Sequence, residues 1–92
     1  MQDQSAPGRH KARLARGHRL EKRPGWSGDV LICPAGMVQL NSSAAAILEL
    51  CDGTRTCEEI VIHVAGAANE VLAGDVRAFL SAAGRRGWIV GS

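Results

Sequence analysis

The apolar positions of this chain change their period near residue 41. Before that point, residues 29–33 (DVLIC) and 37–40 (MVQL) form two short runs rich in β-forming residues. The Pro-Ala-Gly sequence between them is typical of a tight turn, so the two runs predict an antiparallel β-hairpin. A further short strand is expected at 18–21, ahead of turn-forming residues at 24–28.

After residue 41 the apolar residues recur at the spacing of one helix face. The first predicted helix is capped by Asn41 or Ser42 and ends at 52–53, where a glycine is expected to close the last turn in the left-handed conformation. The second begins at a capping box, in which Thr56 and Glu59 each satisfy an unpaired backbone donor.

A third helix is expected over residues 72–86, followed by an apolar clasp at 88–90. Its predicted inner face consists of Leu72, Val76, Phe79, Leu80 and Ala83. The order of elements predicts an α+β, winged-helix-like fold: an N-terminal β-hairpin, possibly of three strands, followed by three short helices.

Charge is distributed unevenly along the chain. Residues 1–23 hold seven Lys and Arg against two Asp and Glu, whereas residues 24–92 hold four against seven. Residues 1–16 are polar, basic and aperiodic, and we expect them to form a flexible arm ahead of a single domain at 17–92.

Several classes of protein are disfavoured by what the sequence lacks. It has no apolar run near the length of about 20 residues that spans a bilayer, so no membrane association is expected. The charged start has no apolar stretch behind it, which argues against a secretory signal. The three cysteines follow no disulfide-framework spacing, which suits a reducing cytoplasm.

Metal binding and catalysis also receive little support. Cys51, Cys57 and His63 fall at intervals of six and form no C-x-x-C or H-x₃-H pair, so burial of the cysteines is favoured over ligation. Ser42 and Ser43 stand at a helix start, where capping explains them. We therefore expect no metal, no cofactor and no enzymatic activity.

Several motifs resemble one family. They are Gly17-His18-Arg19-Leu20, the run from Pro34 to Asn41, the run from Ile47 to Gly53, Thr56, Glu59-Ile60, the run from Asp75 to Leu80, and Arg86-Gly87-Trp88. In these positions the sequence resembles the PqqD family of pyrroloquinoline quinone (PQQ) biosynthesis. The resemblance implies a peptide chaperone that binds the ribosomal precursor peptide PqqA and presents it to the radical S-adenosylmethionine (SAM) enzyme PqqE. It also implies that the peptide adds as a strand at an open sheet edge and packs against the third helix.

On this basis we predict two walls for a peptide-binding site. The edge strand would supply Met37, Val38, Gln39 and Leu40, and the third helix would supply Val76, Arg77, Leu80, Ser81 and Gly84. The alternative is that the strand residues only fill the core, and alternation of side chains allows both to hold in part. Arg77 either binds a peptide carboxylate or is a surface charge, paired with Asp75 or unpaired.

A winged-helix DNA-binding protein is the main alternative function. The hairpin, the three helices and the basic arm fit it, but the body is net negative and offers few cations to phosphates, so no nucleic-acid partner is expected. An uncovered strand edge also leaves a homodimer open.

Overall fold

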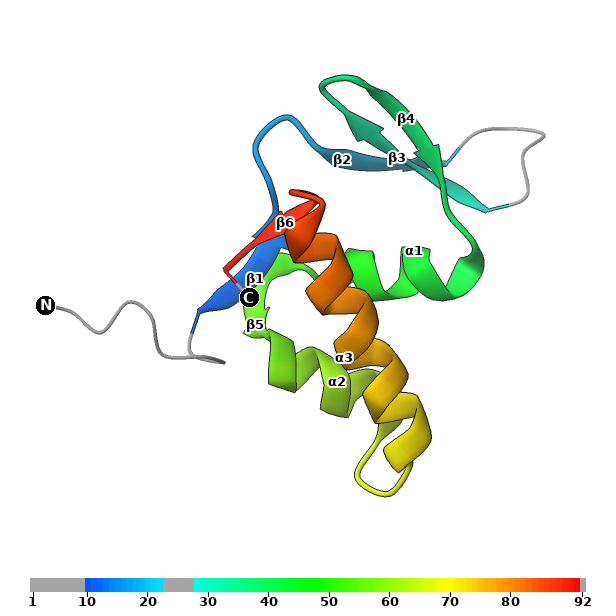
Figure 1. The fold of residues 1–92 in the computed structure, drawn as a ribbon, viewed down its shortest axis with the longest axis vertical. Coiled ribbons are helices and arrows are strands. Elements are labelled where there is room, and N and C mark those ends of the chain that lie inside the picture. The colour runs from blue at the N-terminus through cyan, green and yellow to red at the C-terminus, as the bar shows by residue number, and fades with distance from the viewer. Residues whose placement is uncertain (1–9, 23–27, 92) are drawn as a thin grey trace, which may run out of the picture.

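The computed structural model describes residues 10–22 and 28–91. This part of the chain forms two three-stranded sheets and three helices, and the α+β class with N-terminal strands ahead of three helices is confirmed (Figure 1). The predicted turn at 24–28 lies almost entirely outside the described residues.

The predicted hairpin is confirmed, and it belongs to a three-stranded antiparallel sheet. Its strands are β2 (Arg19–Lys22), β3 (Asp29–Cys33) and β4 (Gly36–Gln39), with β3 in the centre. Leu31 of β3 faces Val38 of β4 in the register. The extra strand exists but begins one residue later than predicted.

A second sheet joins segments that are distant in the sequence. β1 (Lys11–Leu14) lies between β5 (Asp52–Thr56) and β6 (Ile89–Val90) and pairs antiparallel with both. β6 is the apolar clasp that the sequence predicted. The sheet therefore ties the start of the described chain to its end.

The expectation of a flexible arm over residues 1–16 is wrong for its second half. Ala12 is 0% exposed, and the Ala15 N–H donates to the Trp88 carbonyl at 2.9 Å. The strand alternates charged outward residues with apolar inward ones, and its basic composition concealed this two-residue period. Residues 1–9 lie outside the described part.

All three helices begin at a side-chain cap. In α1 (Ser42–Glu49) the Asn41 Oδ1 accepts from the Ala44 N–H at 2.8 Å, and α2 (Cys57–Ala65) opens with the predicted capping box. α3 (Glu70–Arg85) begins two residues earlier than predicted.

The predicted end of the first helix at 52–53 is wrong. α1 ends at Glu49, and Gly53, with φ +88°, lies within β5 instead of closing a helix. The Asp-Gly-Thr sequence is typical of turns, but here the segment pairs with β1. The left-handed conformation expected of this glycine is present, at a different kind of element.

The helices and the two sheets share one core. α1 packs on the sheet of β2, β3 and β4, while α2 packs on α3 (Figure 1). The largest fully buried side chains of the core are Leu31, Leu48, Ile60, Val30, Val61 and Val76. None of the described helices has the length and apolar character required to cross a bilayer.

Candidate functional site

β4 is an edge strand within the described residues, because only β3 pairs with it. The Leu40 N–H donates to the Asp29 carbonyl of β3 at 2.9 Å. In an antiparallel pair, residues alternate between those that bond the neighbouring strand and those that do not. Val38 therefore directs its N–H and C=O groups toward β3, whereas Met37 and Gln39 direct theirs away from it.

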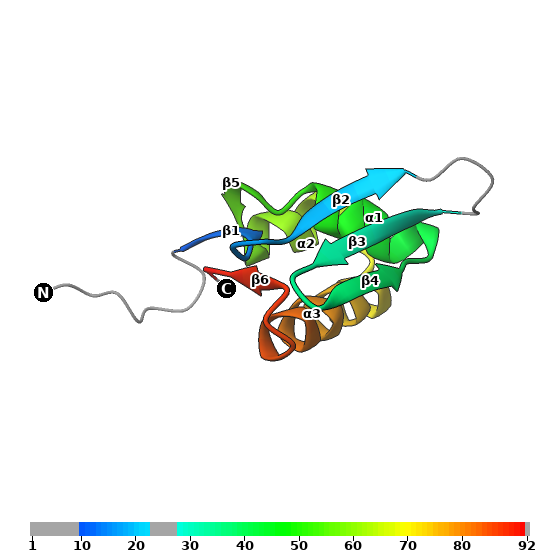
Figure 2. The same cartoon turned by 90° about the horizontal axis from the view of Figure 1, so that it is seen from above.

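The side chains of this segment alternate as the prediction requires. Leu40 is 4% exposed and Val38 is half-buried, so both pack inward. Met37 is 52% exposed and Gln39 is also exposed. One face of the strand thus fills the core while its edge lies on the side of the sheet that faces α3 (Figure 2).

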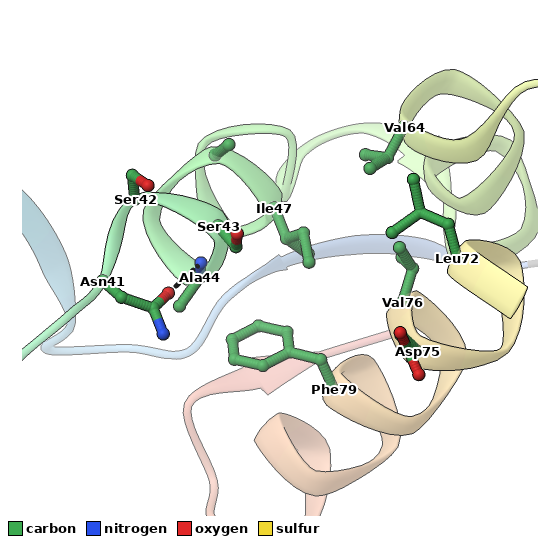
Figure 3. Close-up of a pocket in the computed structure, with 11 residues that line it drawn as sticks. Asn41, Ser42, Ser43, Ala44, Ile47, Val64, Leu72, Asp75, Val76 and Phe79 are labelled. Atoms are coloured by element: carbon green, nitrogen blue, oxygen red, sulfur yellow. Dashed lines mark hydrogen bonds between the residues drawn. The ribbon is translucent and has the colours of Figure 1, made fainter.

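A hollow of about 560 Å³ lies where the chain leaves β4 and enters α1. We call it the α1 hollow. Its lining residues are Asn41, Ser42, Ser43, Ala44, Ala46, Ile47, Val64, Leu72, Asp75, Val76 and Phe79. Figure 3 shows Ile47 of α1 across this space from Leu72 and Phe79 of α3. The lining is mostly apolar but includes the carboxylate of Asp75, so the hollow suits a guest side chain with an aliphatic or aromatic part, with or without a polar end.

A second hollow, of about 470 Å³, lies at the opposite end of β4 beside the hairpin turn. We call it the hairpin hollow. It is lined by His18, Cys33, Pro34, Ala35, Gly36, Met37, Val38, Arg86 and Trp88. The guanidinium carbon of Arg86 lies 5.2 Å from the centre of the Trp88 ring, within the range of a cation–π contact.

One stripe of α3 connects the two hollows. Asp75 and Phe79 line the α1 hollow, and Arg86, directly after the helix, lines the hairpin hollow. These three residues are spaced by four and seven positions, which places them on one side of a helix. We refer to the β4 edge, the two hollows and this stripe together as the groove.

The predicted helix residues are divided between the groove and other surroundings. Val76 is 1% exposed and lines the α1 hollow, while Leu80, 2% exposed, belongs to the core. Arg77 and Ser81 lie two positions to either side of Phe79, a rotation of about 200° that places them on the opposite flank of α3. Gly84 is half-buried and lines neither hollow.

Arg77 is engaged by α2. Its Nε and Nη2 atoms donate to the two carboxylate oxygens of Glu58 at 3.0 and 3.1 Å. This hydrogen bonding lowers the pKa of Glu58. Of the alternatives considered for Arg77, a surface ion pair is the one present, although its partner is Glu58 and not Asp75.

Sequence reasoning missed several groove residues, above all Asp75, Arg86 and Trp88. The helical spacing predicts Phe79 on the inner face of the third helix, and in the structure it is half-buried. The spacing of Asp75, Phe79 and Arg86 was the available signal. This spacing shows that the three residues share one side of the helix, but it does not show that this side borders β4.

Cys51 and Cys57, which line neither hollow, are poor nucleophiles. Burial raises the pKa of Cys51 to about 12 and also raises the pKa of Cys57. All three cysteines are free, and among the described residues no three His, Cys, Asp or Glu side chains lie close enough to hold a metal ion.

Comparison with known proteins identifies the family. The family model of coenzyme PQQ synthesis protein D (PqqD) matches residues 29–89. The chain belongs to the PqqD family. The matched span includes β4, α3 and all the residues that line the two hollows except His18, whereas β1 lies outside it.

Relatives of this PqqD family member are similar over most of their length. A protein of Stutzerimonas stutzeri, named PqqA binding protein, is 42% identical over 76 residues, covering 80% of this chain and 83% of its own. The protein of the same name from Azotobacter vinelandii is 41% identical over 78 residues, covering 83% and 85%.

A solved relative extends the likeness to the N-terminal strands. It is the solution NMR structure of the PqqD truncation of Methylobacterium extorquens PqqCD, described as a functional, stand-alone recognition element for ribosomally synthesized and post-translationally modified peptides. The TM-score is 0.68 at 25% identity, with 97% of this chain and 99% of the relative covered.

Proposed function

We propose that this PqqD family member binds a PqqA-like precursor peptide as an added strand along the β4 edge, in the biosynthesis of PQQ. The observation that carries the proposal is the outward direction of the Gln39 backbone groups, on an edge strand beside the groove. The names of the relatives, PqqA binding protein, support the identity of the guest.

Strand addition divides affinity and selectivity between backbone and side chains. Main-chain hydrogen bonds to an edge strand attract any extended peptide. Alternate side chains of the guest then point toward α3, where the α1 hollow and the hairpin hollow can receive them. A peptide with suitably spaced side chains is therefore preferred over other extended segments.

The chain acts in this proposal as a carrier without chemistry of its own. A radical SAM enzyme of the PqqE type would receive the bound peptide and modify it, as the family resemblance implies. The raised pKa values of Cys51 and Cys57 make these two thiols poorly suited to catalysis. Co-purification of the chain, the peptide and the enzyme tests whether the three associate.

DNA binding is not the function we propose. α2 carries Glu58 and Glu59 in its first turn, and the Arg77 charge is neutralised by Glu58. A duplex would meet few available cations on these helices, since phosphate contacts require lysines or arginines directed outward. Self-association remains an outcome to measure, because two copies that paired through β4 would occupy the edge that the peptide needs.

The proposal is tested by titrating the ¹⁵N-labelled chain with synthetic PqqA peptide. We expect saturable amide shifts at residues 36–41 and along the α3 stripe, with smaller changes in β5 and β6. A peptide of the same composition in scrambled order is the control. Saturable binding without any shift in β4 would place the peptide elsewhere and refute the proposed edge.

A further inference from the structure

We propose that the groove is electrically polar, so that it selects a guest peptide with an acidic side chain at the hairpin hollow and a basic side chain at the α1 hollow. Arg86 would bind the acidic side chain, and Asp75 would bind the basic one. This inference rests on the proposed function and specifies the chemistry of the peptide segment that the groove accepts.

The positions of the two charges follow from the geometry of α3. Asp75 and Arg86 are eleven positions apart, which is about three helical turns, so they share one side of the helix. The rise along the axis is about 16 Å, close to the length of five residues in an extended strand. Because successive side chains of a strand point to opposite faces, the two guest side chains should be four or six positions apart.

Asp75 and Arg86 are also available for a guest. Other charges of these helices and strands are paired, as Glu58 is with Arg77 and Asp29 is with Lys22 at 3.1 Å. Within the described part of the chain, Asp75 and Arg86 take part in no ion pair. The guanidinium of Arg86 contacts the Trp88 ring, and this cation–π contact leaves its charge without a carboxylate partner among the described residues.

A cation is favourable at the C-terminal end of a helix, but this effect alone does not explain why an arginine stands at position 86. Arg85 precedes it in the last turn of α3 and interacts with the same end of the helix dipole. The Arg85 Nη1 donates to the Ser81 hydroxyl at 2.9 Å, on the flank away from the groove. Arg85 is therefore a matched control: it has the same charge and helix end but borders no groove hollow.

The test measures dissociation constants of synthetic PqqA peptide for four charge reversals. Arg86→Glu and Asp75→Lys alter the groove, and Arg85→Glu and Glu70→Lys make the same change of net charge elsewhere on α3. We expect each groove reversal to weaken binding about five- to tenfold, and each control to change it less than about twofold. The difference in dissociation constant between the groove reversals and their controls should become smaller in high salt, because exposed charges are screened.

A charge scan of the peptide identifies the partners. Each acidic residue is changed in turn to Lys and each basic residue to Glu. We expect one acidic position whose reversal restores affinity for Arg86→Glu and one basic position whose reversal restores affinity for Asp75→Lys. These two positions should be four or six residues apart.

The outcomes separate this inference from the proposed function. If the wild-type chain shows no saturable binding of the peptide, the proposed function fails and the polarity fails with it. If the wild-type chain binds with shifts in β4, but the groove reversals weaken binding no more than their controls, only the polarity is overturned. Rescue at peptide positions next to one another would also overturn it, because the two sites are about 16 Å apart.

Discussion

Replacement of Gln39 by proline should test peptide binding at the β4 edge without disturbing the pairing of β4 with β3. Proline has no N–H, and it is tolerated in edge strands where the N–H faces away from the neighbouring strand. Gln39 meets this condition, because the Leu40 N–H bonds Asp29 and the bonding residues alternate along the strand. The substitution should therefore leave the β3–β4 hydrogen bonds intact.

The expected effect on binding is large compared with the effect on folding. One backbone hydrogen bond contributes about 0.5–1.5 kcal/mol net, and a factor of ten in affinity corresponds to about 1.4 kcal/mol. The proline ring also occupies the place where the guest carbonyl would approach. We expect Gln39→Pro to weaken binding of PqqA peptide at least about tenfold, while the free energy of unfolding changes by less than about 1 kcal/mol.

Calorimetric titration gives the affinity, and urea unfolding gives the stability. Gln39→Ala retains the backbone N–H and should bind the peptide within about twofold of the unmodified chain. Val38→Pro is the reverse control, because the Val38 N–H faces β3 and loss of that ladder hydrogen bond should destabilise the fold by about 1–3 kcal/mol. If Gln39→Pro binds the peptide as tightly as Gln39→Ala does, strand addition at β4 is refuted.

Four further predictions concern the fold. Deletion of residues 1–14 removes the central strand of the β5–β1–β6 sheet and should sharply lower the thermal midpoint; an unchanged midpoint would contradict the pairing of β1. Leu80→Ala should cost about 2–5 kcal/mol in urea unfolding, and a loss below about 0.5 kcal/mol would show that its side chain is not core. Cys51 should resist alkylation at pH 8 until the chain unfolds, since burial raises its pKa to about 12; mass spectrometry of labelled peptides will report any early reaction. Glu58→Gln should lower the free energy of unfolding at neutral pH but not in acid. Pairing with Arg77 lowers the pKa of Glu58 from 4.5, so the ion pair stabilises the fold above pH 4.5 and this stabilisation is lost as the pH falls through the lowered pKa. A difference in stability between the variant and the unmodified chain that persists at about pH 2 would contradict the ion-pair mechanism.

Local signals predicted the helices and the hairpin well, because those elements depend on residues close in sequence. The capping box of Thr56 and Glu59 and the cap at Asn41 are readable from a few residues. β1 and β5 could not be identified in this way. Each is short and carries charged residues, and each is stabilised by pairing with a segment far away along the chain, which local propensity does not encode.

The site shows the same division. Residues 37–40 were predicted as a strand from their β-forming residues and a turn signal, and as the edge strand from the family resemblance. The structure places an edge strand at Gly36–Gln39. The helix wall was identified only in part. The apolar stripe of α3 showed which residues face the core, but not which flank of the stripe borders β4, so Arg77 and Ser81 were included while Asp75 and Arg86 were missed.

The pairing of β1 with β6 has a consequence for tethering. The described chain begins beside Lys11 and ends at Gly91, where an added Cβ would lie only 2.1 Å from the Lys11 carbonyl oxygen, so entry and exit are adjacent. This junction also lies close to one end of the groove, because Trp88, which lines the hairpin hollow, directly precedes β6 (Figure 2). A linker that leaves either end of the described chain therefore starts beside the hairpin end of the guest strand's path. A fusion should retain affinity for the precursor when its linker is long enough to hold the added domain clear of that end.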